Sequence, residues 1–173
     1  RSCSGSSSIL LASEEKAKIF SDQPIEITGI GQKTTSASFT KNILGEIEST
    51  RIAADLAYKM AKIEAKQIDV AEVHDAFSVC ELMAISELGL TSNEKSGEFV
   101  RDLFNTENRM INPRGGLIGA GHPLGATGIS QTIEITNQLQ GKSDKRQISN
   151  AKIGLIHNMS AAGTSSSIMV LKN

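Results

Sequence analysis

Residues 112–128 read NPRGGLIGAGHPLGATG and place six glycines within positions 115–128. We expect a helix to follow, from Ala126 to Gln140. The segment is not a Walker loop, because no Gly-Lys-Ser/Thr follows. Its GxGxxxG spacing is also one residue too long for the dinucleotide fingerprint. A glycine-rich turn before a helix still exposes backbone N–H groups, which stabilise an anion or an oxyanion at the positive helix end.

His122 lies in the middle of this glycine segment. Pro123 follows it, stiffens the turn and biases His122 away from helical geometry. The segment is therefore expected to hold the His122 imidazole in a fixed position beside backbone N–H groups that are free to bind an anion. The structural alternative is that a loop packed closely against a sheet also needs small residues.

The rest of the chain alternates strand-like and helix-like runs, which predicts an α/β sheet with helices on its faces. Residues 91–110 are polar and are expected to be irregular. The strands are expected at residues 6–13, 25–31, 70–73, 152–158 and 165–172, and the helices at 14–20, 49–66, 78–89 and 126–140.

The helix expected over residues 49–66 carries one apolar stripe. Ile52, Leu56, Met60 and Ile63 recur along it at spacings of four or three. Such a stripe is typical of the buried side of an amphipathic helix. Gly89, after the next helix, is a typical left-handed cap.

The chain has three histidines, and each follows or ends a strand-like run: His74, His122 and His157. Ligands of open α/β sheets bind at the carboxyl ends of strands, and an imidazole titrates near neutral pH. A lone histidine is more often a structural donor to a backbone carbonyl. No HxxxH or CxxC spacing is present, so we predict no metal site. Cys80 is expected to be a buried small residue.

Composition narrows the class of protein. The length of 173 residues fits one domain, and the net charge of −1 with dispersed Lys and Arg argues against nucleic-acid binding. Two cysteines form no disulfide scaffold and suit a reducing, cytoplasmic location. No apolar run approaches the ~20 residues of a membrane span.

Four blocks of the sequence together resemble the C-terminal half of a thiolase, in the sterol carrier protein X-type and archaeal form. They are VHDAFSVCELMAISELGL, GEFVRD, INPRGGLIGAGHPLGATGISQTIEITNQLQG and IGLIHNMSAAG. The resemblance implies a thiolase-like half-domain with a mixed, mostly parallel sheet and helices on both faces. It also implies that residues 1–24 end the N-terminal half-domain and that residues 25–173 form the C-terminal one.

The resemblance also implies roles for single residues. His122 matches the histidine that takes the proton from a nucleophilic cysteine, and His74 matches the residue of an oxyanion hole. Asn112 matches the asparagine that organises the glycine loop. Phe77, Gly121, Asn158 and Gly163 match residues that shape the substrate site. The substrate would be an acyl-coenzyme A, with no bound cofactor.

The chain departs from the thiolase pattern in two ways. The nucleophilic cysteine belongs to the N-terminal half, so this polypeptide alone should be inactive in thiolysis. The second cysteine is also missing, because residues 157–163 read HNMSAAG and position 76 is Ala. His157 or a water molecule is a hypothetical substitute as acid and base.

Three functions remain open from the sequence. The first is an acyltransferase of the acetyl-CoA acetyltransferase or 3-ketoacyl-CoA thiolase type, paired with an N-terminal half and assembled as a homodimer or larger. The second is a thiolase-like retro-aldolase that works on acyl-CoA side chains with a small OB-fold partner. The third is a non-catalytic subunit that binds acyl-CoA.

Overall fold

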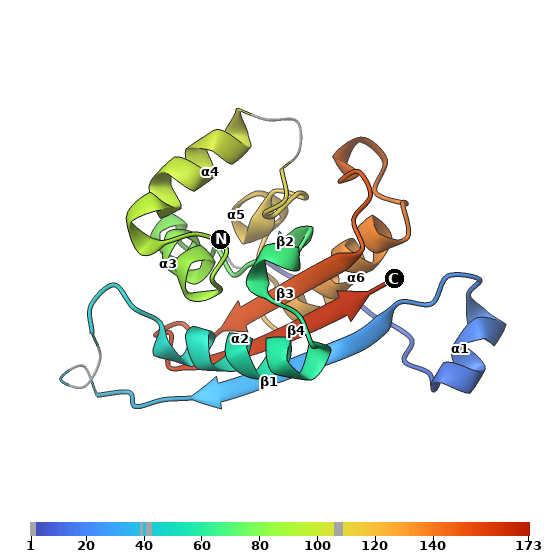
Figure 1. Cartoon of the computed structure of the whole chain (residues 1–173), viewed down its shortest axis with the longest axis horizontal. Coiled ribbons are helices and arrows are strands. Elements are labelled where there is room, and N and C mark those ends of the chain that lie inside the picture. The colour runs from blue at the N-terminus through green and yellow to red at the C-terminus, as the bar shows by residue number, and fades with distance from the viewer. Residues whose placement is uncertain (1–2, 39, 41–42, 106–108) are drawn as a thin grey trace.

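The computed structural model of the chain describes residues 3–38, 40, 43–105 and 109–173. Within these residues the chain forms a four-stranded sheet in the order β1-β4-β3-β2 (Figure 1). The strands are β1 (Glu26–Thr34), β2 (Val70–Glu72), β3 (Ile153–Met159) and β4 (Ser165–Lys172). The last two strands of the chain therefore form the middle of the sheet.

The strand directions differ in part from the expectation. β2 and β3 run parallel, whereas β1 pairs with β4, and β3 with β4, in antiparallel directions. The α/β class and the mixed sheet are confirmed, but a mostly parallel sheet is wrong. The short Ser-Ala-Gly turn between β3 and β4 explains part of the difference, because only antiparallel neighbours can be joined by a tight hairpin.

Helices cover both faces of the sheet, as expected. α2 (Glu48–Ala61) packs on β1 and β4, and α6 (Thr127–Leu139) packs on β3 and β2 from the opposite side. Successive residues of a strand point to opposite faces. Leu155 accordingly joins the cluster with α2, and Ile156 joins the cluster with α6. We call these two sides of the sheet the α2 face and the α6 face.

The middle of the apolar stripe expected to bury α2 faces outward instead, while Ile52 and Ile63 are half-buried. Leu56 is 48% exposed and Met60 is 58% exposed, whereas the buried side consists of small residues such as Ala53 and Ala57. The backbone of α2 lies so close to β1 that a side chain at Gly31 would collide with the Ala53 carbonyl. This close approach leaves no room for large side chains between helix and strand. The helix also ends at Ala61, five residues before its expected end.

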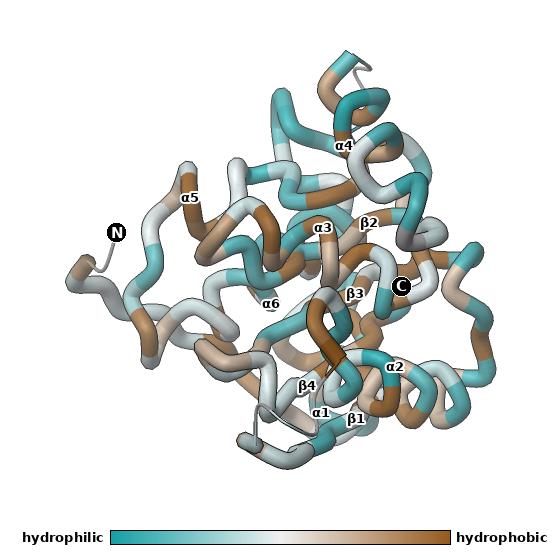
Figure 2. The backbone as a smooth tube through the Cα atoms, turned by 90° about the vertical axis from the view of Figure 1, so that its left-hand side faces the viewer, coloured by the Kyte–Doolittle hydropathy of each residue, from teal (hydrophilic) through white to brown (hydrophobic). Residues whose placement is uncertain are grey.

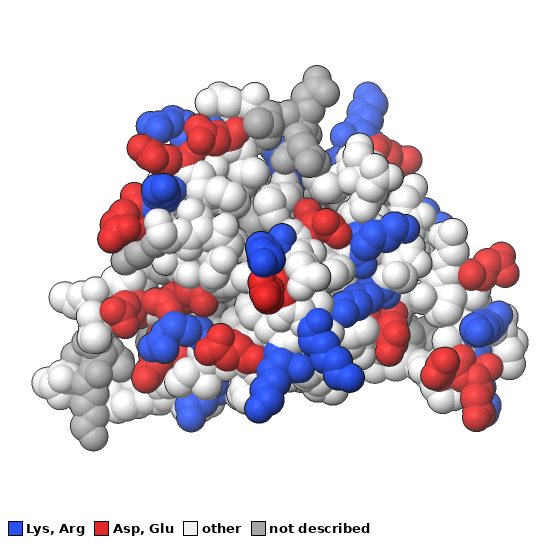
Figure 3. All heavy atoms as spheres, in the orientation of Figure 1, with Lys and Arg blue, Asp and Glu red and all other residues white. Residues whose placement is uncertain are grey.

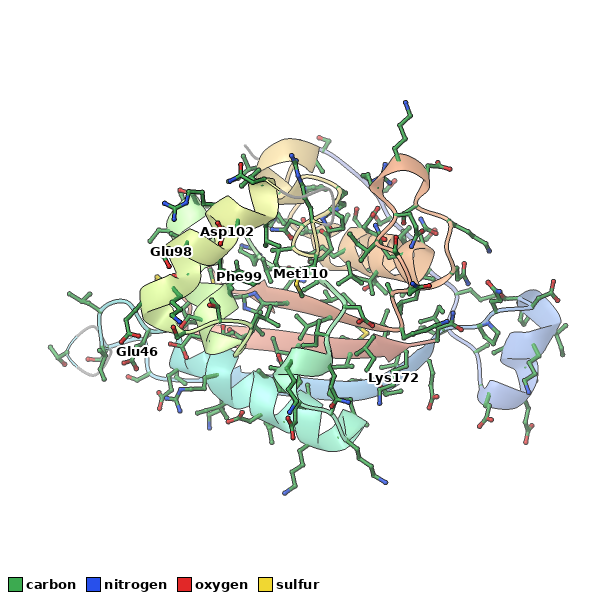
Figure 4. All side chains as sticks on the ribbon, turned by 45° about the horizontal axis from the view of Figure 1, so that its top comes forward. Glu46, Glu98, Phe99, Asp102, Met110 and Lys172 are labelled. Atoms are coloured by element: carbon green, nitrogen blue, oxygen red, sulfur yellow. The ribbon has the colours of Figure 1, made fainter. Side chains whose placement is uncertain are left out.

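Between β2 and α6 the chain forms α3 (Ser78–Glu87), which ends as expected with Gly89 at a positive φ of 72°. The segment expected to be irregular contains η2 (Asn93–Lys95) and α4 (Ser96–Phe104). Phe99 points from α4 toward Met110, and both pack on the core, whereas Glu98 points away (Figure 4). The segment was expected to be irregular because its many charged residues made the short apolar stripe of α4 hard to recognise in the sequence. Residues 106–108 lie outside the described residues.

The N-terminal part differs from its expectation in one element. Residues 6–13 form no strand, while α1 (Glu14–Phe20) is confirmed and projects from the body of the molecule (Figure 1). A strand requires a neighbouring strand for its backbone hydrogen bonds, and none of the described residues supplies one here. Leu10 and Leu11 are exposed. The boundary between residues 1–24 and 25–173 stays a prediction, and residues 1–2 lie outside the described part.

Two short elements complete the fold. α5 (Gly116–Ala120) belongs to the glycine segment, and η3 (Asp144–Arg146) connects α6 to β3. Lys and Arg lie interspersed with Asp and Glu on the face shown in Figure 3. Among the described residues we find no helix with the length and apolar character needed to cross a membrane.

Candidate active site

A cavity of about 940 Å³ opens on the α6 face, beside the residues that follow β2 and the end of β3. Most of its lining is apolar and comes from the sheet, α5 and α6, with Leu117 and Ile156 as examples. The polar or sulfur-bearing side chains of the lining are those of His74, Cys80, His122, Thr132, Asn158, Met159, Ser160, Ser167 and Met169.

His74 and His122 meet at this cavity although they come from distant parts of the chain. Their ring centroids lie 5.1 Å apart, with the planes at 86°. His74 follows β2, and His122 follows α5, whose last turn ends at Gly121 with a φ of 92°. The segment after Cys3 runs beside this turn, in the region of α5 and the N-terminus in Figure 2.

The hydrogen bond of His122 defines which ring nitrogen carries its proton. Nδ1 lies 2.8 Å from the Thr127 hydroxyl oxygen. That hydroxyl donates its own hydrogen to the Pro123 carbonyl, 3.1 Å away, so it accepts from His122. Neutral His122 therefore holds its proton on Nδ1 and has a lone pair on Nε2. This is the form that a general base requires.

His74 is held in a similar way by Asn158. The side-chain amide of Asn158 donates to Gln131 Oε1 at 2.5 Å, which leaves its Oδ1 beside His74 Nδ1 at 3.4 Å. Because Oδ1 only accepts, His74 donates from Nδ1. Burial lowers the pKa of His74 below its ordinary value, and the neighbouring His122 lowers it further, so the neutral ring is favoured.

The loop before α5 is tied to the sheet by polar side chains. Asn112 accepts from the Val73 amide at 2.8 Å and donates to Glu81 at 3.0 Å. It has a positive φ of 49° and lies outside the cavity lining. The carboxylate of Asp75 accepts from the amide of Leu117 at 2.6 Å. This amide N–H at the start of α5 is therefore occupied by a side chain. The anion-stabilising role expected for the turn before the helix that begins near Ala126 stays a prediction.

A buried ion pair holds the same loop to β2. Arg114 Nε donates to Glu72 Oε2 at 2.8 Å, and its Nη1 donates to Ser130. Burial raises the pKa of Glu72 to about 7, although the Arg114 cation opposes that rise. The second oxygen of Glu72 has no hydrogen-bond partner among the described residues. The loop that carries His122 is thus bound to β2, the strand that precedes His74.

His157 does not reach the cavity. Its side chain points to the α2 face, is 0% exposed and is absent from the cavity lining. Nδ1 accepts from the His74 backbone amide at 3.4 Å, so Nε2 carries the proton and donates to Thr50 at 3.0 Å. Burial lowers the pKa of His157 to about 3. The hypothesis that His157 substitutes for the second cysteine is therefore wrong, because both its nitrogens are occupied away from any substrate.

The bond from His157 to Thr50 begins a chain of hydroxyl groups on the α2 face. Ser49 donates to the Gly163 carbonyl at 2.6 Å, so it accepts from Ser166 at 2.7 Å. Ser166 in turn accepts from Thr50 at 2.9 Å. Each of the three hydroxyl groups in this hydrogen-bonded series donates one hydrogen bond. The series connects the strand that carries His157 to the β3–β4 hairpin at Gly163, which lies outside the cavity lining.

Two further residues lie at the cavity. Phe77 is 66% exposed at the start of α3. Cys80, in the first turn of α3, lines the cavity and is only partly buried, and burial raises the pKa of its thiol. The expectation of a buried structural cysteine is therefore wrong. Within the described part of the chain, no cluster of three His, Cys, Asp or Glu side chains is arranged to hold a metal ion.

The polar residues of α6 were not expected from the sequence to belong to the site. Thr127, Gln131, Glu134 and Gln138 recur at spacings of four, three and four, and all are buried. The periodicity was visible, but a polar stripe on a helix normally indicates its solvated side. Only the structure shows that this stripe faces the sheet and supports both cavity histidines.

A family model described as thiolase C-terminal domain-like matches residues 29–173. The chain belongs to the thiolase family. This thiolase domain is similar to the acetyl-CoA acetyltransferase of Methanothermobacter thermautotrophicus, with 35% identity over 96% of the chain and 44% of that protein. It is also similar to sterol carrier protein 2 of Oryctolagus cuniculus, with 38% identity over 92% of the chain and 30% of that protein.

A solved structure supports the thiolase fold. The chain of an Ltp2-ChsH2(DUF35) aldolase superposes with a TM-score of 0.75 and 19% identity, over 86% of this chain and 39% of that one. The thiolase domain thus spans less than half the length of each of these three proteins.

Proposed function

We propose that this chain is the part of a thiolase-family acyltransferase that supplies the activating histidine. The observation that carries the proposal is the meeting of His122 and His74 at one mostly apolar cavity, with ring centroids 5.1 Å apart. An apolar cavity fits the acyl part of an acyl-coenzyme A, and the two imidazoles fit the proton transfers of acyl exchange. No cofactor is required beyond coenzyme A as a substrate.

His122 would act on a nucleophilic cysteine from an N-terminal half-domain. Its Nε2 lone pair would take the thiol proton, and the thiolate would attack the thioester carbonyl of the acyl-coenzyme A. The bond between Thr127 and His122 Nδ1 keeps the lone pair on Nε2 and stabilises the imidazolium that forms. We further propose that the active protein is a homodimer or larger assembly.

The lack of a thiol in the β3–β4 hairpin favours a second candidate. Residues 158–163 read NMSAAG, so in this alternative the domain serves a thiolase-like retro-aldolase that works with an OB-fold partner protein. Such an enzyme breaks a carbon–carbon bond of an acyl-CoA side chain and needs no acyl-cysteine.

The test uses the complete natural protein and radiolabelled acetyl-CoA. The expected result is release of coenzyme A together with an acetyl group on a cysteine outside this chain, found by mass spectrometry of its peptides. Transfer of that acetyl group to a second acetyl-CoA would complete the assignment. Cleavage of a β-hydroxyacyl-CoA without any acyl adduct would support the retro-aldolase. Binding of acetyl-CoA with neither reaction would indicate a non-catalytic subunit.

A further inference from the structure

The proposed reaction has two different protons to move, and the cavity has one imidazole for each. The first proton leaves the nucleophilic thiol, and the second leaves the α-carbon of the other acyl-CoA. Thiolases normally use a second cysteine for the α-carbon, and this chain has none in the hairpin at residues 158–163. His157 is occupied on the other face of the sheet. A proton acceptor for the α-carbon therefore has to be sought among the residues that line the cavity.

His74 and His122 are held in the same way. Each ring donates from Nδ1 to a fixed oxygen, Thr127 Oγ1 for His122 and Asn158 Oδ1 for His74. Each neutral ring then has its lone pair on Nε2. The resemblance to thiolases assigned an oxyanion-hole donor to position 74, but a neutral His74 with its proton on Nδ1 cannot donate from Nε2. The geometry fits an acceptor.

We propose that His74 is the acid/base residue that takes the α-carbon proton of the substrate and returns it. This inference rests on the proposed function. In the step itself the α C–H bond breaks, the proton moves to His74 Nε2 and the electron pair moves onto the thioester oxygen as an enolate. The enolate carbon then bonds to the acyl carbon of the acyl-enzyme. The cysteine thiolate then leaves as the new carbonyl forms. His122 has already given the first thiol proton to the departing coenzyme A, so the α-carbon proton held on His74 is the one that returns the cysteine to its thiol form.

Asn158 and Gln131 are positioning residues in this arrangement. Gln131 is 0% exposed and fixes the Asn158 amide through the 2.5 Å bond to its Oε1. That bond turns Asn158 Oδ1 toward His74 and keeps the His74 proton on Nδ1. The lowered pKa of His74 agrees with this, because a base must be unprotonated before it reacts.

Cys80 is the remaining titratable side chain in the lining. Burial raises the pKa of its thiol, so it holds its proton at neutral pH and is a poor base. Cys80 and His74 can be distinguished by experiment, because only one of them should control exchange of the α-proton.

The experiment measures two half-reactions of the complete natural protein with acetyl-CoA in D₂O. One is acetylation of the protein, followed by mass spectrometry, and the other is exchange of the acetyl-CoA α-protons, followed by NMR. We expect His74→Ala and His74→Gln both to lower exchange by about 10²- to 10⁴-fold. Acetylation should change by less than about tenfold in the same variants.

The glutamine variant separates the two roles of position 74. Glutamine keeps an N–H donor but cannot take a proton, so retention of exchange in His74→Gln, with loss in His74→Ala, would identify an oxyanion donor and overturn the proposal. Loss of exchange in Cys80→Ser, with retention in His74→Gln, would also overturn it. If the wild type shows neither acetylation nor exchange, the proposed function fails and this role fails with it.

The proton position on His74 can be determined without turnover. Nitrogen-15 NMR of histidine-labelled protein should show His74 protonated on Nδ1, and a signal from protonated Nε2 in the neutral ring would overturn the proposal. Asn158→Asp retains an acceptor and should preserve the Nδ1 signature. Asn158→Leu should lose it and lower kcat with little change in KM. A merely structural role of Asn158 would leave the tautomer unchanged.

Discussion

The α2 face and the α6 face of the sheet each bury a polar cluster around a histidine, and β3 supplies both clusters from adjacent residues. On the α2 face His157 has both nitrogens bonded, and Thr50, Ser166 and Ser49 continue the chain to a backbone carbonyl. On the α6 face Asn158 leaves His74 beside a cavity, and Glu72 retains an oxygen without a partner among the described residues.

This difference separates a histidine with both ring nitrogens bonded from one with a single bonded nitrogen beside a cavity. A buried polar group whose hydrogen bonds are all made contributes stability and specificity, and it has nothing left for a substrate. A group with one committed nitrogen and one facing a cavity is available for proton transfer. The face to which a strand residue points thus decides its role, and substitutions on the two faces should have different consequences.

The largest expected effect is on the α6 face. In the complete protein, His122→Ala should slow acetylation by about 10³-fold, since it removes the base that we propose activates the nucleophile. Its effect on the free energy of unfolding should stay below about 1 kcal/mol, because the side chain is only partly buried. Quenched acetylation assays and urea unfolding measure the two quantities. An unchanged acetylation rate would remove His122 from the mechanism.

The next largest effect is on the packing of the α2 face. Gly31→Ala should lower the free energy of unfolding by about 3 kcal/mol, because its new methyl group meets the backbone of α2 at Ala53. The matched control is Gly97→Ala in α4, where nothing lies within 4 Å of the added carbon. That variant should be stabilised by up to about 1 kcal/mol. Equal urea midpoints for the two variants would contradict the close contact.

A smaller effect is expected when the hydroxyl chain is interrupted. Thr50→Val should cost about 2 kcal/mol, because the His157 N–H and Ser166 each lose a partner in a buried site. Thr34→Val is the control, since Thr34 pairs with Ser165 at an exposed position on the edge strand and should cost less than about 0.5 kcal/mol. If both variants unfold at the same urea concentration, the hydrogen-bonded hydroxyl groups on the α2 face add no stability.

The smallest effect concerns pH. The pKa of His157 is about 3 in the folded protein and 6.5 in the unfolded chain, so the unfolded chain binds the extra proton below pH 6.5 and stability falls with decreasing pH. Glu72 acts in the opposite direction, since its folded pKa of about 7 exceeds its unfolded value of 4.5 and stability rises as pH falls over that range.

The substitution His157→Gln separates the contribution of His157 to the pH dependence of stability from that of Glu72. Between pH 6.5 and 5.5 the stability difference between wild type and this variant should shrink by about 1 kcal/mol, because the unfolded wild-type chain gains its proton over this range. Urea unfolding at both pH values measures it. A difference that stays constant would mean that His157 is protonated in the folded protein.

Much of the fold followed from local sequence, and the errors have common causes. β3, β4, α3 and α6 lie close to their expected positions, because alternation, helix caps and the Gly89 stop act within a few residues. The stripe of α2 was placed on the wrong side, because the close packing of Gly31 against Ala53 depends on a strand outside the helix. α4 was missed because its charged residues hid Phe99.

The residues of the candidate site also divide into those that local sequence patterns indicated and those that only the structure revealed. The glycine segment singled out His122, and the HDAF motif singled out His74, but nothing local set His157 apart from them. Strand alternation shows that His157 and Asn158 face opposite sides, yet it does not show which side holds a cavity. Gln131 and the exposure of Cys80 to the cavity were overlooked because a polar helix residue and a small thiol have no distinctive local pattern.

The sequence by itself determined the α/β class, the thiolase family and the two histidines that meet at the cavity. These depend on local periodicity and on motifs whose residues are close together in the chain. The tertiary structure alone decided the directions of the strands, the buried side of α2 and the positions of the His74 and His157 protons. Those properties depend on which distant groups become neighbours, since a hydrogen bond or a steric contact forms only at short range.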